Sequence, residues 1–300
     1  MSLQELADIT SSEEAAIGFL RGRNALRRTP PDCPTCLAPM NRVFVRKRSQ
    51  FWRCSRHTSV SKSIRSGSFW DKCHITMVQA VRLVYNWAYQ VPVKHSVDQI
   101  GLSETRIIQW NQFIRDLCSW DLLHRPIEIG GPGLTVQIDE SQVAKRKYHR
   151  GRYVPGSERW VFGGVCPQTG EGFLELVPNR RAETLLQVIE RRIRPGSTIN
   201  SDMFASYNGI QNIPVNPPYV HNVVNHKENF VCPLTGTHTN HVENYWKNAK
   251  LAFKRMCGVQ GTNLESHLDE FLWREKLDPK TGQESFYRIL EVMSQRYPTP

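Results

Sequence analysis

The chain has 300 residues, 39% of them hydrophobic, and a formal net charge of +11. This length and apolar content predict one large folded domain with one or two small ones. No run of 18 apolar residues occurs and the N-terminus is polar and acidic, so we expect neither secretion nor membrane insertion. The basic residues gather in segments 21–72 and 145–159, which indicates a polyanionic partner; a charged surface that only keeps the protein in solution is the alternative.

Residues 1–30 predict a short amphipathic helix followed by a basic tail, and residues 31–70 predict a small β unit stapled by a metal ion. Two ligand pairs, seventeen residues apart, suit one tetrahedral Zn²⁺ ion in a zinc ribbon. For the fourth ligand, Cys73 or His74 could take the place of His57. The alternative to a metal site is a set of unrelated buried cysteines. The expected ligands are Cys33, Cys36, Cys54 and His57.

Segment 71–128 predicts helices. Residues 75–90 place apolar side chains at helical spacing, a short helix then ends at a turn beginning with Gly101, and a longer helix follows. The longer helix carries Arg106 and Gln109 on an exposed face, a pattern typical of a helix-turn-helix that binds DNA. Two helices that only pack against each other would give the same pattern.

Segment 129–277 has the pattern of an α/β domain. Three consecutive strands, a helix and a fourth strand follow one another, which is the element order of a ribonuclease H-like mixed sheet. A right-handed crossover places the fourth strand parallel to the first, so Asp139 and Asp202, at the carboxyl ends of these strands, are expected to be neighbours. A C-terminal helix is predicted over 278–300.

Glu243 lies in a strongly helical segment that also carries Lys247 and Lys250. One face of this helix presents a carboxylate and then two cations, which suits a metal ion beside a DNA phosphate; a solvent-facing salt-bridge ladder is the alternative. Carboxylates that are far apart in sequence but converge in space are typical of sites that hold Mg²⁺ against a phosphodiester. The three acidic residues therefore indicate metal-dependent phosphoryl transfer.

Two further basic segments are candidates for DNA contact. Cations are interleaved with aromatic residues on a hairpin expected between the cysteine pairs, and an insertion leaves directly from the strand of Asp139. For the insertion, a surface hairpin without DNA contact is the alternative. The candidates are Arg46, Lys47 and Arg48 in the first segment, and Lys145, Arg146 and Lys147 in the second.

Five stretches in combination resemble one known family. They are IDESQ, RPGSTINSD, VNHKENFVCPLTG, HTNHVENYWKNAK and HLDEFLWRE. From about Cys33 to Lys276 the chain resembles the transposases of the Merlin group of DNA transposons and the related bacterial insertion-sequence transposases. The resemblance implies a DDE transposase with a ribonuclease H-like catalytic domain behind a zinc ribbon and a helix-turn-helix. It matches Asp139, Asp202 and Glu243 to the acidic triad, and relatives usually carry cysteine where this chain has His57.

The resemblance also implies a two-metal mechanism. Two Mg²⁺ or Mn²⁺ ions about 4 Å apart would activate a water, and later a 3′-hydroxyl, for in-line attack. Asp139 would bridge both ions, and Asp202 and Glu243 would complete one ion each. His226 and His238 would support the site, or would only satisfy buried hydrogen bonds.

The expected partners are double-stranded DNA, both terminal inverted repeats and target, and further copies of the chain in a homodimer or larger assembly. The expected location is the nucleus, or the cytoplasm if the source is bacterial. Two alternatives to a cut-and-paste transposase stay open: a domesticated DNA-binding protein that keeps the fold, and a structure-selective nuclease.

Overall fold

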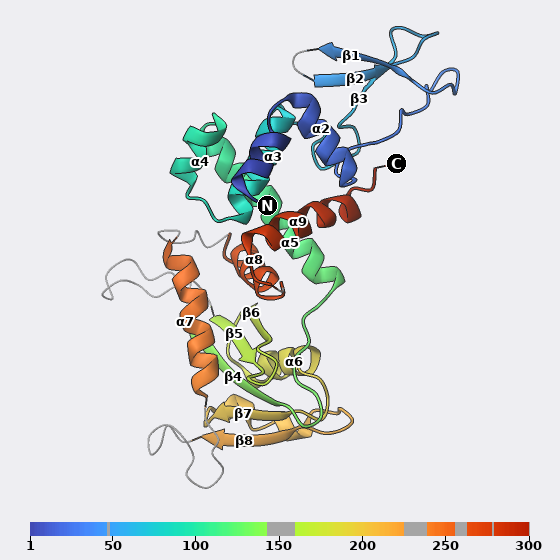
Figure 1. Cartoon of the computed structure of the whole chain (residues 1–300). Helices are drawn as coiled ribbons and strands as arrows, with labels where there is room; N and C mark the ends of the chain where they lie inside the picture. The colour runs from blue at the N-terminus through green and yellow to red at the C-terminus, as the bar shows by residue number, and fades with distance from the viewer. Residues whose placement is uncertain (47–48, 143–159, 225–238, 256–262, 278, 300) are drawn as a thin grey trace, which may run out of the picture. The chain divides into compact units, whose positions relative to one another are not determined.

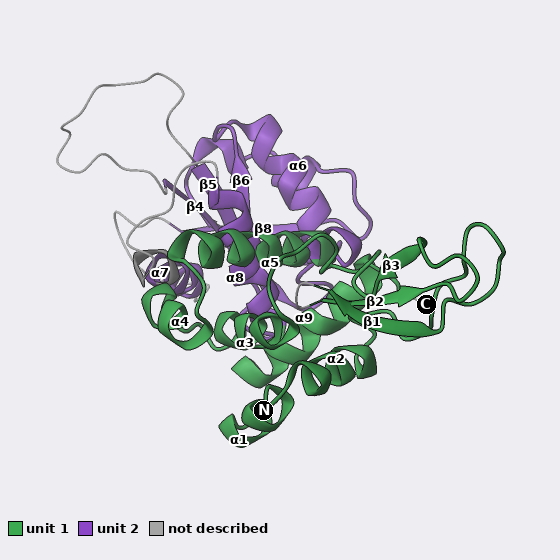
Figure 2. Cartoon of the chain, turned by 90° about the horizontal axis from the view of Figure 1, so that it is seen from above, with its two compact units in different colours: residues 1–121, 277–300 green, residues 122–276 purple. Residues whose placement is uncertain are grey.

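The structure, a computed structural model, describes residues 1–46, 49–142, 160–224, 239–255, 263–277 and 279–299. The chain divides into two compact units, shown in different colours in Figure 2. Unit 1 comprises residues 1–121 and 277–300, and unit 2 comprises residues 122–276. Within the described ranges, no helix is long and apolar enough to cross a membrane.

Unit 1 contains a three-stranded antiparallel sheet in the order β1-β2-β3. Its strands are β1 (Arg42–Arg46), β2 (Ser49–Arg53) and β3 (Ser61–Ser63). Aromatic and β-branched residues occupy the centre of β1 and two positions of β2, and these residue types favour extended backbone. Phe44 and Phe51, cross-strand partners in the β1–β2 hairpin, stack with ring centroids 5.5 Å apart. The hairpin expected between the cysteine pairs is therefore present.

The helices that begin in unit 1 are α1 (Leu3–Ile9), α2 (Glu13–Gly22), α3 (Met77–Ala88), α4 (Val93–Ile100), α5 (Glu104–His124) and α9 (Gly282–Arg296). Local signals set their ends: Ser2 and Thr76 cap α1 and α3, and Gly101, with a φ of 73°, ends α4. α9 comes from the end of the chain, yet its Phe286 is fully buried, with its ring centroid 6.0 Å from that of Phe19 in α2. The C-terminal helix, expected as a separate segment, is thus part of the unit 1 core.

Unit 2 is built on a five-stranded mixed sheet in the order β6-β5-β4-β7-β8. Its strands are β4 (Thr135–Gln142), β5 (Trp160–Val165), β6 (Gly172–Val177), β7 (Thr198–Asp202) and β8 (Val220–Val224). β4, β5 and β6 are antiparallel neighbours, whereas β7 runs parallel to β4 and β8 runs parallel to β7. The expected mixed α/β sheet, with its first and fourth strands parallel and adjacent, is confirmed.

Helices cover both faces of this sheet. They are α6 (Ala182–Arg192), α7 (Asn240–Arg255) and α8 (Leu264–Glu275), with two short 3₁₀ turns, η2 (Ala205–Tyr207) and η3 (Ile210–Asn212). Figure 1 shows α7 along one side of the sheet and α6 on the other. Side chains of β4 alternate between the two sides, so that Val136 and Ile138 are buried on one, while Gln137 and Asp139 point to the other.

Candidate functional site

Asp139 and Asp202 lie level with each other on neighbouring parallel strands. In the β4–β7 register Gln137 pairs with Asn200. Two residues further along, on the same face of the sheet, Asp139 therefore stands beside Asp202, and both are partly buried. Asp202 Oδ1 also accepts the backbone N–H of Phe204 at 2.9 Å, which turns the chain at the end of β7. The structure thus brings together two carboxylates that are far apart in sequence.

Glu243, the third carboxylate, is carried by the first turn of α7 and is exposed. Gln137 of β4 holds the start of this helix, because its Oε1 accepts the backbone N–H of His241 at 2.9 Å and that of Val242 at 3.3 Å. N–H groups in a first helical turn have no intrahelical acceptor. Since Gln137 and Asp139 share a face of β4, α7 brings Glu243 to the face that carries Asp139.

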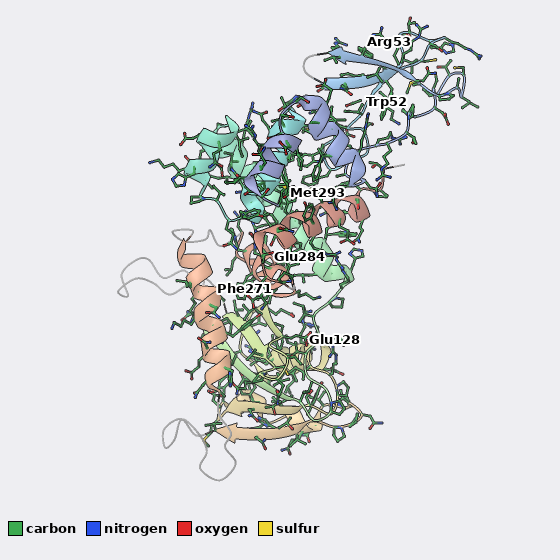
Figure 3. All side chains as sticks on the ribbon, viewed as in Figure 1. Trp52, Arg53, Glu128, Phe271, Glu284 and Met293 are labelled. Carbon is green, nitrogen blue, oxygen red and sulfur yellow. The ribbon has the colours of Figure 1, made fainter. Side chains whose placement is uncertain are left out.

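Two glycines let α7 lie close to the sheet. A Cβ atom on Gly163 would stand 3.1 Å from Cζ2 of Trp246, and one on Gly172 would stand 2.7 Å from Cζ of Tyr245. The Tyr245 ring in turn contacts Phe271 of α8, labelled in Figure 3, at a centroid distance of 5.7 Å. Aromatic rings thus occupy the space that side chains at these glycines would need, and close packing sets the position of α7.

The surroundings of Asp139 raise its pKa to about 7. Burial is the largest cause, and the negative charges of Glu140, Asp202 and Glu243 add to it, whereas a backbone hydrogen bond at Glu140 acts in the opposite direction. Carboxylates this close retain a proton or bind a cation. A divalent cation would remove the repulsion, and carboxylate oxygens are the ligands that Mg²⁺ and Mn²⁺ prefer. The donor set therefore fits an ion of this type.

Glu140 points to the opposite face, where other side chains hold it. Its carboxylate accepts hydrogen bonds from the Tyr207 hydroxyl and from Arg180 Nη1, the latter at 3.1 Å, and only 6% of its side chain is exposed. The Arg180 guanidinium lies over the Trp160 ring, 3.9 Å from its centroid. Burial and the charge of Glu140 raise the pKa of Tyr207 well above its usual value, so its hydroxyl remains a donor. Because Tyr207 lies shortly after Asp202, this bond ties the segment following β7 to the end of β4.

A second candidate site, in unit 1, has ligand atoms that all lie within 4.8 Å of one another. It consists of Cys33, Cys36, Cys54 and His57. The Sγ atoms of Cys36 and Cys54 are 3.6 Å apart, and His57 Nδ1 lies 3.8 Å from Cys33 Sγ and 3.7 Å from Cys54 Sγ. Zn–S bonds of about 2.3 Å and Zn–N bonds of about 2.0 Å in a tetrahedron give ligand separations of about 3.6–3.8 Å. The spacing therefore fits one tetrahedral Zn²⁺ ion. Elsewhere in the described ranges no metal-ligand group is as tightly gathered, the three carboxylates of unit 2 included.

The lowered pKa values of Cys33 and Cys54 favour the thiolate form that binds a metal ion. A backbone hydrogen bond from Ala38 acts to lower the pKa of Cys36, but burial and the neighbouring thiols raise it. Burial acts to raise the pKa of the Cys33 thiol, but backbone hydrogen bonds from Thr35 and Cys36 and the neighbouring thiols lower it to about 6. A backbone bond from His57 lowers the pKa of Cys54, and hydrogen bonds to the Cys54 and Cys33 sulfurs raise the pKa of His57. A metal ion that binds the thiolates and the neutral imidazole displaces the protons that the cluster otherwise holds.

Cys73 does not join the cluster. Its Sγ lies 3.1 Å from Nη1 of Arg65, and the same nitrogen donates to the backbone oxygens of Cys73 and Ile75. The neighbouring His74 lines a cleft next to α5. Of the residues considered for the fourth position, the structure places only His57 among the three cysteines.

The expected DNA contacts in unit 1 lie on two surfaces. Arg46 is exposed at the end of β1. Arg106 and Gln109 are exposed on α5 and line a cleft of about 460 Å³ together with Trp110 and Phe113. An exposed cation next to aromatic rings is a suitable surface for nucleic acid.

In unit 2, Lys247 and Lys250 are exposed on α7. The ammonium group of Lys250 lies 5.8 Å from the centroid of the Trp246 ring, which holds its stem near the sheet-facing side of the helix. Several expected residues lie outside the described part of the chain: Lys47, Arg48, Lys145, Arg146, Lys147, His226 and His238.

Sequence reasoning missed two groups that shape the site. Gln137 looked like one polar residue of an alternating strand, and neither Tyr207 nor Glu140, although Glu140 lies in IDESQ, was given a role. A signal for Gln137 was present, because it lies between two apolar residues in a strand that helices cover on both faces. A polar side chain buried in such a strand needs a hydrogen-bond partner.

Comparisons with known proteins add an independent observation. Residues 129–276 match the family model of the ISXO2-like transposase domain. Over 99 residues the chain is 28% identical to an uncharacterized transposase-like protein of Haemophilus influenzae, covering 33% of this chain and 76% of that protein.

Among solved structures, the chain aligns at 14% identity with the catalytic core domain of HTLV-2 integrase in complex with magnesium, covering 47% of this chain and 84% of that one with a TM-score of 0.31. The catalytic core of BIV integrase aligns at 14% identity over 54% of this chain and 97% of that one, with a TM-score of 0.34. Because these TM-scores are low, the fold is described by its own strand order and not by these neighbours. Residues 129–276, which carry the mixed sheet described above, are thus similar to the ISXO2-like transposase domain.

Proposed function

We propose that this protein is a cut-and-paste DNA transposase of the Merlin type. Residues 129–277 form its ribonuclease H-like catalytic domain, and the catalytic residues are Asp139, Asp202 and Glu243. One observation carries the proposal: three acidic side chains from a strand, a parallel neighbouring strand and a helix share one face of a sheet, in the segment that matches a transposase domain. Beyond the effect of burial, the negative charges of Glu140, Asp202 and Glu243 raise the pKa of Asp139.

Asp139, Asp202 and Glu243 would hold two Mg²⁺ or Mn²⁺ ions, with Asp139 shared between them. When bound, such ions supply charge stabilisation at the phosphodiester and lower the pKa of an attacking water or 3′-hydroxyl. The chain's own residues position the DNA. Lys247 and Lys250 follow Glu243 on α7 and face solvent, where they contact the phosphates on either side of the scissile bond. Lys145, Arg146 and Lys147 of the insertion act as a clamp, and His226 and His238 support the site.

Recognition of the terminal inverted repeats belongs to the N-terminal part of the chain. Residues 31–70 act as a zinc ribbon and residues 71–128 as a helix-turn-helix, preceded by the N-terminal helix and tail. The ribbon is supported by the tetrahedral spacing of the cysteine and histidine ligands. The helix-turn-helix is supported by α4, the left-handed turn at Gly101 and the exposed Arg106 and Gln109 of α5.

A transposase must hold two transposon ends at once, so the active form is a homodimer or larger assembly. It acts where genomic DNA lies, in the nucleus or, in a bacterial host, in the cytoplasm. These features follow from the proposed reaction, because joining two ends to one target requires two sets of cutting residues in one complex.

The test is an end-cleavage and strand-transfer assay with the whole chain. Duplex DNA that bears the ends of its own element is incubated with and without Mg²⁺. We expect cleavage and joining in Mg²⁺, and we expect Asp202→Asn to bind the ends nearly as well as the wild type without cutting them. Glu183→Gln, which removes an exposed acid on α6, is the matched control and should cleave at the wild-type rate.

Normal cleavage by Asp202→Asn in Mg²⁺ would contradict the catalytic assignment. Specific end binding by the wild type, with no cleavage in either Mg²⁺ or Mn²⁺, would favour the alternative of a domesticated DNA-binding protein.

A further inference from the structure

Gln137 has an unusual position for a polar side chain. It is the third residue of β4, is only 2% exposed, and is flanked in sequence by the fully buried Val136 and Ile138. A polar group buried in this way costs stability unless its hydrogen bonds are made. The hydrogen-bond partners of Gln137 therefore indicate why a polar residue occupies this position.

Among the partners of Gln137 are two first-turn amides of α7. Its Oε1 atom accepts from His241 N at 2.9 Å and from Val242 N at 3.3 Å, across 104 and 105 positions of sequence. Both partners are N–H donors, so the oxygen and not the amide nitrogen of Gln137 must face them. A helix is commonly capped by a side chain just before its own start, which accepts from the same two positions. In α7, β4 supplies such an acceptor through Gln137.

This cap links two of the three carboxylates through one side chain. Gln137 and Asp139 are two residues apart on the same face of β4, a separation of about 6.6 Å. Glu243 directly follows Val242, whose N–H Gln137 accepts. The strand that carries one carboxylate therefore holds the helix turn that carries another.

We propose that Gln137 is a positioning residue, which caps α7 and thereby sets Glu243 relative to Asp139; its consequence for metal binding depends on the proposed function. The residue type suits the task. Aspartate or glutamate would also accept both N–H groups, but either would add a negative charge to a face that already holds three. A neutral amide caps the helix without that repulsion.

The first test needs no metal ion and no DNA. Hydrogen exchange of the α7 amides is measured in the metal-free whole chain for the wild type and for Gln137→Met, which keeps the volume and removes the acceptor. We expect the first-turn amides of α7 to exchange at least about tenfold faster in the variant, with the β5–β6 amides unchanged. Gln137→Glu, which keeps two acceptor oxygens, should restore the protection.

Gln137→Asn serves as a second variant should the methionine chain not fold, because it keeps a polar amide in the sheet but is too short to reach α7. Tyr219→Phe is the matched control. It removes a different buried hydrogen bond of unit 2, from the Tyr219 hydroxyl to the Ile193 oxygen at 2.6 Å, at the opposite end of the parallel strands. It should reduce overall stability and leave α7 exchange as in the wild type.

The second test is Mn²⁺ binding to the whole chain, followed by electron paramagnetic resonance. We expect affinity to fall at least about tenfold in Gln137→Met and to stay unchanged in Tyr219→Phe. Wild-type exchange and wild-type Mn²⁺ affinity in Gln137→Met would overturn the proposal. Mn²⁺ binding that is insensitive to Asp139→Asn would instead overturn the proposed function, and hydrogen exchange would still decide whether Gln137 caps α7.

Discussion

Trp246 of α7 lies directly over Gly163 of β5: a Cβ atom at position 163 would stand 3.1 Å from Cζ2 of Trp246 and 2.6 Å from Cδ2 of Leu174. Gly163 is also the cross-strand partner of Asp139. The same position therefore borders one carboxylate and the helix that carries Glu243. The contact explains why a strand interior, where glycine is intrinsically unfavourable, has no side chain at this point.

Gly163→Ala is expected to lower the free energy of unfolding by about 1–3 kcal/mol, because the added methyl group overpacks the contact with Trp246 and Leu174. It should also weaken Mn²⁺ binding by displacing α7. Gly18→Ala is the matched control, since a Cβ atom at this helical position of α2 meets nothing within 4 Å. Its stability should rise by about 0.5–1 kcal/mol. Urea denaturation of both variants measures the difference, and equal stability of Gly163→Ala and the wild type would show that the space is not needed.

The pKa of Asp139 makes stability depend on pH in the absence of metal. Its folded-state pKa of about 7 lies above the ordinary 3.8, so the folded state binds more protons between these values. The contribution of Asp139 to stability is therefore most favourable below about pH 4 and is lost as the pH rises through 7. The loss is about 4 kcal/mol at most, from about 1.4 kcal/mol per pKa unit.

Denaturation in EDTA between pH 5 and 8, compared with Asp139→Asn, isolates this effect from other carboxylates. The stability difference between the two proteins should grow with pH, and a saturating divalent cation should reduce it. A pH-independent difference would mean that Asp139 titrates at its ordinary pKa.

Tyr207→Phe removes the hydroxyl that donates to the buried Glu140 carboxylate. Arg180 remains as a donor at 3.1 Å, so we expect a loss of about 1–3 kcal/mol in the free energy of unfolding rather than complete unfolding. The segment that follows Asp202 should lose protection from hydrogen exchange, because its tie to β4 is gone. In the double variant Glu140→Gln/Tyr207→Phe, the Tyr207→Phe substitution should lower the free energy of unfolding by less than it does in the otherwise wild-type protein. Simple additivity would show that the two side chains do not act as a pair.

The cysteine–histidine cluster is expected to hold one Zn²⁺ per chain. Cys54→Ser should lose the metal and unfold the β1–β3 sheet, since so small a unit depends on the metal for its stability. Cys73→Ser is the control, because the Cys73 thiol contacts Arg65 and not the cluster. Metal analysis and circular dichroism of the whole chain measure both effects. Zinc retained at one per chain in Cys54→Ser, or lost in Cys73→Ser, would be contrary to this assignment.

Much of this protein was determined by sequence alone, through patterns that act over short distances. The alternation in β4 and the apolar stripe of Val242, Trp246 and Ala249 in α7 specify element type, because side-chain direction repeats every two residues in a strand and every 3.6 in a helix. The crossover rule then places β7 beside β4, and the spacing of the cysteine pairs brings their thiols together. These features can be predicted without knowing which residues remote in sequence are in contact.

Only the tertiary structure decided the rest. It brings α9 into the core of unit 1, selects His57 over Cys73, and gives the α7 amides an acceptor on a strand 104 positions away. The pKa of Asp139 likewise depends on burial and on charges from separate elements. Each of these is set by packing between segments remote in sequence, and the energy of such contacts depends on distances of a few ångströms that local periodicity does not specify.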